Sequence, residues 1–173
     1  MDAQLKQIED NTCVKFVRRS IERDYVVIGN YNGCSSLVGR SGGRQNISMS
    51  YNRVQKTTCL WGPTMMHEMM HALGIQHMHN SIDRDKYISV HLENVYASSQ
   101  KNFNIVNGTT SNSLGTPYDL RSATHYANWQ FSSNGGNVLV PHDPEYLLII
   151  GRLKVLSTGD ITRINQMHSC SVF

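Results

Sequence analysis

The sequence of 173 residues predicts an α+β fold with two lobes and a cleft between them. Strand-like segments and a short amphipathic helix come before residue 62, a histidine-rich helix follows, and few regular elements come after it. We therefore expect one domain over residues 1–173, with an N-terminal lobe of about 1–75 and a C-terminal lobe of about 76–173. The histidine-rich helix is expected at the floor of the cleft.

The N-terminal lobe is expected to hold one helix and several short strands. Residues 2–10 have the apolar spacing of an amphipathic helix. Segments 13–17 and 25–29 are rich in Val, Ile and aromatic residues, which is typical of strands. A short strand is expected at 36–38 among glycine-rich turns, and residues 46–50 alternate apolar and polar side chains as an edge strand does.

The histidine-rich helix opens with Gly62-Pro63-Thr64, where Thr64 is expected to be the N-cap. Its apolar stripe predicts a buried helix and consists of Met65, Met69, Ala72 and Leu73. Further on, residues 95–103 are expected to form a helix and residues 104–115 a loop.

A final helix is predicted near the C-terminus. Ser157-Thr158-Gly159-Asp160 has the spacing of a capping box, in which the serine and the acidic residue satisfy each other's backbone N–H groups. Ile161, Ile164 and Met167 follow at intervals of three and provide its apolar face.

The stretch from His67 to His77 reads H-E-x-x-H-x-x-G-x-x-H. Residues four apart share a helix face, so His67 and His71 point the same way. Gly74 can leave the helix with a positive φ, and the chain then returns His77 to the same point. Three neutral imidazoles with an open fourth position are the ligand set of a catalytic zinc ion.

Glu68 follows the first histidine and is the candidate general base for a zinc-activated water. The pattern therefore predicts hydrolysis of peptide bonds with one Zn²⁺ per chain. The competing interpretation is a methionine-rich core helix with chance histidines. A chance match to the full pattern has a probability on the order of 10⁻⁴ or less at this composition, so we favour the metal site.

Composition excludes several other classes of protein. The net charge of +3 and the lack of a basic run argue against nucleic acid, and no apolar run is long enough to span a membrane. Four cysteines without a C-x-x-C spacing favour two disulfides and an oxidising compartment. Since the first residues do not form a signal peptide, we expect the chain to be either a fragment of a secreted protein or an incomplete gene model of one. The sequons at Asn46 and Asn107 are of a kind that is frequent by chance.

Beyond the zinc motif, the sequence resembles the astacin family of metzincin endopeptidases. The signature continues from His67 to Asp83-Arg84-Asp85. Pro117-Tyr118-Asp119 and Ser122-Ala123-Thr124-His125-Tyr126 resemble the family's Met-turn region. The early segment Cys13-Val14-Lys15-Phe16 and the last helix up to Cys170 are similar as well, so the resemblance covers nearly the whole chain.

The resemblance implies a metzincin-like N-terminal lobe with a twisted, mostly parallel sheet and two helices. The family's opening strand is missing, so we interpret the chain as truncated at its N-terminus. The implied disulfides join Cys13 to Cys170 and Cys34 to Cys59. Tyr126 is implied as a further zinc-site residue that also stabilises the tetrahedral oxyanion.

Several positions depart from the family pattern. Thr124 replaces the methionine of the Met-turn and buries a hydroxyl group that needs a partner, which predicts a looser zinc site. Met78 replaces a glutamate that anchors the mature N-terminus. Ser81 and His168 replace an arginine and a tyrosine. Leu153 stands where some members carry an arginine that selects acidic side chains.

Three hypotheses about function follow. The first is a secreted, monomeric zinc endopeptidase that cleaves extended polypeptides, with His67, His71 and His77 as ligands and Glu68 and Tyr126 as catalytic residues. The second is an astacin-like module that binds zinc but is catalytically impaired. The third is a zinc amidase for small substrates, which an open cleft between lobes disfavours.

Overall fold

The computed structural model describes residues 2–52, 57–60, 62–106 and 115–170. Its helices and strands are as follows: α1 (Asp2–Asn11), β1 (Tyr25–Gly29), β2 (Cys34–Ser36), β3 (Arg44–Met49), β4 (Tyr51–Asn52), β5 (Thr57–Thr58), α2 (Gly62–Ala72), β6 (Ile88–Val90), β7 (Leu139–Pro141) and α3 (Thr158–Met167). The chain is therefore α+β, as expected. None of the described helices is long and apolar enough to cross a membrane.

The N-terminal sheet is mixed, and the expectation of a mostly parallel sheet is wrong in this respect. Its order is β1-β3-β2, with β1 parallel and β2 antiparallel to β3. The loop between β2 and β3 is short and has left-handed glycines at Gly39, Gly42 and Gly43. A short loop of this kind reverses the chain and pairs its strands antiparallel, whereas parallel neighbours need a longer crossover.

Three expected strands differ in the structure. The strand expected at 36–38 lies earlier in the sequence, at Cys34–Ser36 (β2). Residues 46–49 of the strand expected at 46–50 belong to β3, which is the central strand of its sheet rather than an edge strand. Its residues Ile47, Ser48 and Met49 are all buried, so both faces of the strand are covered. Residues 13–17 form no strand; here the backbone N–H of Phe16 donates to the Glu9 carboxylate at 2.8 Å instead of joining a ladder.

The first hydrophobic core lies between α1, α2 and the N-terminal sheet. It includes Ile8 from α1, Ile47 from β3 and the four methionines of α2: Met65, Met66, Met69 and Met70. The predicted burial of α2 is therefore confirmed. Helix α2 begins at Gly62, so Thr64 lies in its first turn and is not the N-cap that we expected.

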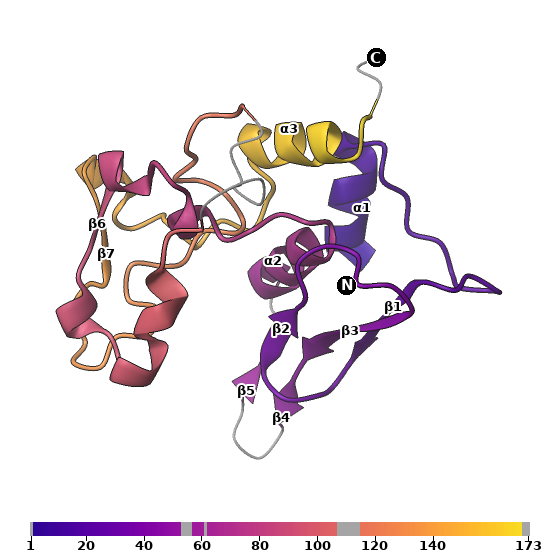
Figure 1. Ribbon diagram of the computed structural model, residues 1–173, viewed down its shortest axis with the longest axis horizontal. Coiled ribbons are helices and arrows are strands. Elements are labelled where there is room, and N and C mark those ends of the chain that lie inside the picture. The colour runs from indigo at the N-terminus through magenta and orange to yellow at the C-terminus, as the bar shows by residue number, and fades with distance from the viewer. Residues whose placement is uncertain (1, 53–56, 61, 107–114, 171–173) are drawn as a thin grey trace.

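The second core belongs to the segment from 88 to 150, which contains mostly short 3-10 helices and the two-stranded sheet β6–β7. The expected helix at 95–103 is a 3-10 helix, Ala97–Phe103. Phe103, Leu139 and Ile150 are buried together in this core. In Figure 1, β6 and β7 lie on the opposite side of α2 from β1 and β3. The loop expected at 104–115 falls largely on residues 107–114, outside the described part of the chain.

The last helix returns to the first core. α3 begins with the predicted capping box between Ser157 and Asp160, and its Ile164 is packed among the residues of the first core. Figure 1 shows α3 beside α1, at the other end of the sequence. A long-range disulfide, Cys13–Cys170, joins these ends, and a cleft disulfide, Cys34–Cys59, joins β2 to the segment before α2. This is the pairing that the family resemblance implies.

Candidate active site

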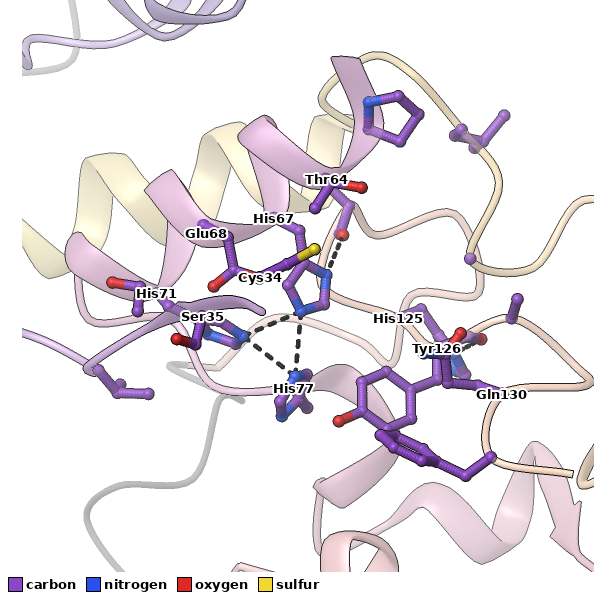
Figure 2. A pocket seen from close by; sticks show the side chains of 18 residues that line it. Cys34, Ser35, Thr64, His67, Glu68, His71, His77, His125, Tyr126 and Gln130 are labelled. Carbon is purple, nitrogen blue, oxygen red and sulfur yellow. Dashed lines mark hydrogen bonds between the residues drawn. The ribbon is translucent and has the colours of Figure 1, made fainter. Parts of the chain in front are cut away.

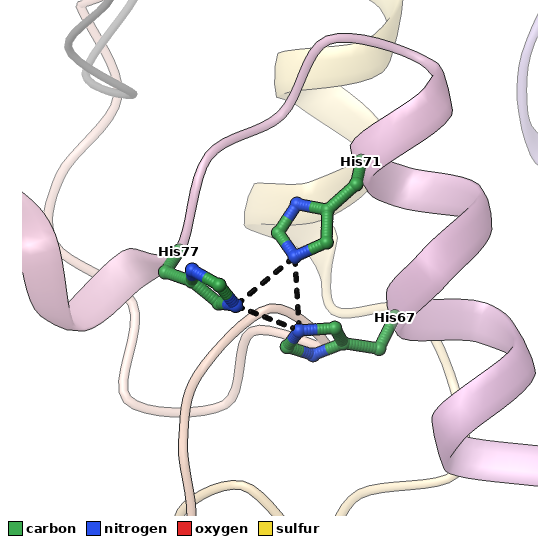
Figure 3. A group of neighbouring side chains, drawn as sticks. All are labelled: His67, His71 and His77. Atoms are coloured by element: carbon green, nitrogen blue, oxygen red, sulfur yellow. Dashed lines mark hydrogen bonds between the residues drawn. The ribbon is translucent and has the colours of Figure 1, made fainter. Parts of the chain in front are cut away.

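Three histidines converge at the end of α2 (Figure 3). His67 and His71 lie one turn apart on the helix, and Gly74, with φ of 99°, turns the chain away after the helix ends. The chain then brings His77 back to face the other two. The three Nε2 atoms lie 3.0–3.1 Å from one another.

Backbone carbonyls determine which ring nitrogens face the centre. The Nδ1 of His67 lies 2.9 Å from the carbonyl oxygen of Ala123, and the Nδ1 of His71 lies 2.7 Å from that of Ile75. A carbonyl oxygen only accepts, so both Nδ1 atoms carry the proton and both Nε2 atoms present a lone pair. Lone pairs facing one another at this distance are unfavourable unless a cation lies between them.

The charges of the site agree with this arrangement. Burial lowers the pKa of His67 to about 3, and the neighbouring His71 adds to the effect. Burial also lowers the pKa of His71 and of His77, so all three rings are neutral at pH 7. The three Nε2 atoms form a triangle with sides of 3.0–3.1 Å. A point slightly above the plane of this triangle lies about 2.0–2.1 Å from each nitrogen, which is the usual Zn–N distance. The donor set therefore fits one zinc ion.

Glu68 lies beside the three histidines, on the cleft side of α2 (Figure 2). Only 5% of the residue is exposed, and this burial raises the pKa of its carboxyl group to about 7. The backbone N–H of Ser36, on β2, opposes the shift by a hydrogen bond to the carboxylate. A carboxyl group of this kind exchanges a proton readily near neutral pH.

Tyr126 approaches the histidines from the other side of the cleft (Figure 2). Its ring is 4.6 Å from that of His77, in an edge-on arrangement. Burial raises the pKa of its phenol to about 12, and the charge of Glu68 contributes to the shift. The phenol is therefore protonated at pH 7 and can donate a hydrogen bond. From the residues alone Tyr126 would be an ordinary tyrosine, and only the family resemblance singled it out.

These side chains line one cavity of about 440 Å³ between the two halves of the chain. One wall is β2, including Ser35 and Ser36, and the floor is α2. The opposite wall comes from residues 123–131 together with Gly151 and Leu153. The structure thus brings all the predicted metal and catalytic residues together, and Leu153 lines the same cleft.

The turn that contains Ser122 and Ala123, beneath the metal site, is hydrogen-bonded to α3. We did not predict this contact from the sequence. Asp160 accepts a hydrogen bond from the Ser122 hydroxyl at 2.7 Å and another from the Ala123 backbone N–H at 2.8 Å. Ala123 in turn holds the ring of His67. Only the capping-box spacing drew attention to Asp160, and it indicated a helix start rather than a support for the site. Thr124, fully buried, finds the partner for its hydroxyl in Ser122 at 3.0 Å.

Comparison with known proteins agrees with this geometry. The family model described as Astacin, a family of peptidases, matches residues 1–169. High choriolytic enzyme 1 of Oryzias latipes is 35% identical over 170 residues, which are 98% of this chain and 60% of that protein. The astacin-like metalloendopeptidase of Gallus gallus is 36% identical over 96% of this chain and 39% of its own length.

The solved structures give the same result for the fold. The structure of high choriolytic enzyme 1, described as a hatching enzyme zinc-protease, superposes with a TM-score of 0.87 over 98% of this chain and 81% of that one. Myroilysin, at 18% identity and a TM-score of 0.61, shares the fold. This chain spans about two fifths to three fifths of the length of its curated relatives. From the family model, the identities and the three-histidine site together, we conclude that the chain belongs to the astacin family of zinc metallopeptidases.

Proposed function

We propose that this chain is a zinc-dependent endopeptidase that forms one peptidase domain over residues 1–173. The observation that carries the proposal is the convergence of three histidine Nε2 atoms beside the buried carboxyl group of Glu68 in an open cleft. A site that served only to hold the fold together would have no use for a carboxyl group in that position. We also propose that it acts outside the cell, since its two disulfides suit an oxidising compartment.

His67, His71 and His77 would hold one zinc ion, which supplies Lewis-acid activation of a water molecule and of the scissile carbonyl group. Glu68 takes a proton from the attacking water and passes it to the leaving amine. Burial, which raises the pKa of the Glu68 carboxyl group, favours its taking up a proton in the cleft. Tyr126 donates its phenol proton in a hydrogen bond to the oxygen that becomes negative in the transition state.

The substrate is an extended polypeptide. β2 is an end strand of its sheet, and its Ser35 and Ser36 line the cleft. A peptide can pair with such a free edge through main-chain hydrogen bonds, which suits proteins of varied sequence. The same pairing is of little use to an amidase with small substrates.

Leu153 supports a further proposal about specificity. It lines the cleft together with Pro63 and Thr64 at the start of α2, where some family members have an arginine. A leucine provides no charge, so we propose that the residue after the scissile bond is not preferentially acidic. Dominant Asp or Glu at this position in peptide-library profiling would overturn this proposal.

The alternative is a module that binds zinc but cleaves poorly. Thr124, with its smaller side chain, replaces the methionine that the family has beneath the zinc site. The two functions are separated by measuring zinc content and cleavage of a denatured protein for the wild type and Glu68→Ala. Cleavage that disappears in Glu68→Ala while zinc stays bound supports the endopeptidase. Bound zinc without any cleavage that depends on Glu68 supports the module.

A further inference from the structure

The ring of Tyr126 is surrounded by other aromatic rings. His79 stacks on it, with ring centroids 4.0 Å apart and planes 28° from parallel. His77 and Phe103 meet it edge-on at 4.6 and 5.9 Å, and Phe131 lies at 5.6 Å. Contacts of this kind on several sides restrict how far the ring can rotate or move.

The stacked ring of His79 carries a cost to stability. His79 is fully buried, and its Nε2 lies 3.1 Å from the carbonyl oxygen of Asn102. Because that carbonyl can only accept, the proton is on Nε2 and Nδ1 is left as an acceptor. Within the described part of the chain, Nδ1 has no hydrogen-bond partner. A buried polar atom left unpaired lowers the stability of the fold, because it loses its hydrogen bonds to water and gains none in return. An apolar ring of similar size would avoid that cost.

Phe131 carries a cost of a different kind. Its φ is 62°, in the left-handed region, where the Cβ atom of a bulky residue comes too close to the following carbonyl oxygen. The backbone is held there by its carbonyl oxygen, which accepts from the N–H of Tyr96 at 3.2 Å. In this conformation the Phe131 side chain lines the cleft next to Tyr126.

We propose that His79 and Phe131 are positioning residues that hold the phenol of Tyr126 at the three-histidine site. The unpaired Nδ1 of His79 and the left-handed backbone of Phe131 each reduce stability, and both residues contact the ring of Tyr126. Costs of this kind that a fold retains around one side chain point to a functional constraint on that side chain. The inference rests on the role of Tyr126 in the proposed function. Neither residue touches the reacting atoms; both act through Tyr126.

A double-mutant cycle tests the role of His79. Loss of one oxyanion donor costs about 10²–10³-fold in kcat, so Tyr126→Phe should fall in that range. His79→Leu removes the flat ring and should lower kcat about tenfold or more with KM nearly unchanged, whereas His79→Phe keeps the ring and should stay within about threefold of wild type. On the Tyr126→Phe background, His79→Leu should have no further effect. An equal loss on both backgrounds, or equal losses in His79→Leu and His79→Phe, overturns the proposal.

A spectroscopic measurement tests the same inference without turnover. Copper(II) binds imidazole ligands, and a tyrosinate oxygen that reaches the copper gives a charge-transfer absorption band. The band should be present in wild type and His79→Phe, absent in Tyr126→Phe, and weakened in His79→Leu. It should also weaken in Phe131→Gly, which removes the ring while glycine accepts the left-handed backbone. An unchanged band in His79→Leu and Phe131→Gly, or no band in wild type, overturns the inference. A band that responds as expected in a protein without protease activity supports the inference and contradicts the proposed function instead.

Discussion

Gly151 passes so close to the peptide bond between Tyr126 and Ala127 that no side chain fits between them. A Cβ atom added at Gly151 would lie 2.6 Å from the Cα of Ala127, and closer still to the peptide bond itself. Gly151 also has φ of 67°, in the left-handed region. This contact fixes the backbone of Tyr126 from the side of the cleft wall, so Gly151→Ala should move the phenol.

The size of the effect follows from these distances. Carbon atoms that are not bonded approach to about 3.5–4.0 Å, so Gly151→Ala must separate the two segments by roughly 1 Å. A displacement of that size near the reacting groups costs up to about 10²-fold in rate. The left-handed backbone adds a loss of about 1–2 kcal/mol in the free energy of unfolding. We therefore expect kcat to fall by about 10- to 100-fold.

Gly135→Ala is the matched control. Gly135 has φ of 79°, and a Cβ added there meets nothing within 4 Å. Both variants carry the backbone cost, but only Gly151→Ala displaces Tyr126. The assay is kcat on a denatured protein together with the urea midpoint of unfolding. The expected result is a large loss of kcat in Gly151→Ala alone, measured without urea where both variants are folded, together with a lower urea midpoint for Gly151→Ala, because only that variant also carries the clash. If both variants lose kcat equally, the reasoning about Tyr126 is refuted.

Three other predictions concern the framework around the site. Replacing the cysteines of the long-range disulfide by alanine should lower the free energy of unfolding, measured in urea, by about 5 kcal/mol, and the same change at the cleft disulfide by about 3.5 kcal/mol. The difference follows from their sequence separations of 157 and 25. Equal losses would contradict the loop-entropy argument. Thr124→Met should raise the affinity for zinc about tenfold in a chelator competition. The hydroxyl of Thr124 is already paired with Ser122, so only the smaller volume of the threonine loosens the site. An unchanged affinity would refute this prediction. Asp160→Asn presents an amide donor to groups that are themselves donors. It should cost about 2–4 kcal/mol and weaken zinc binding. Ser157→Ala should cost about 1 kcal/mol with zinc binding intact, and equal zinc binding in the two variants would exclude a role for Asp160 at the site.

The parts of the site that depend on local spacing could be predicted from the sequence. His67 and His71 meet because of the helical period, and Gly74 allows the turn that returns His77. The capping box of α3 is also a local pattern, and it is present as expected. Such features need only the geometry of a few consecutive residues.

Features that depend on distant segments could not be predicted in this way. The central position of β3 depends on which strands pair with it, and the pattern of 46–50 did not reveal that. Arg163 is 1% exposed although the apolar spacing of α3 assigned no buried role to it. Its guanidinium donates to the Pro117 carbonyl oxygen at 2.7 Å, a partner 46 residues away. The stacking of His79 on Tyr126 likewise joins segments that only the tertiary structure brings together.

The most direct test of the account is a zinc titration of the chelated protein. Three histidines with converging Nε2 atoms should bind one zinc ion per chain, and cleavage of a denatured protein should rise in proportion and stop at one equivalent. The same titration with Glu68→Gln should bind one equivalent and restore no cleavage. Cleavage that survives chelation, or that returns in Glu68→Gln as in the wild type, would contradict a zinc endopeptidase in which Glu68 moves the proton.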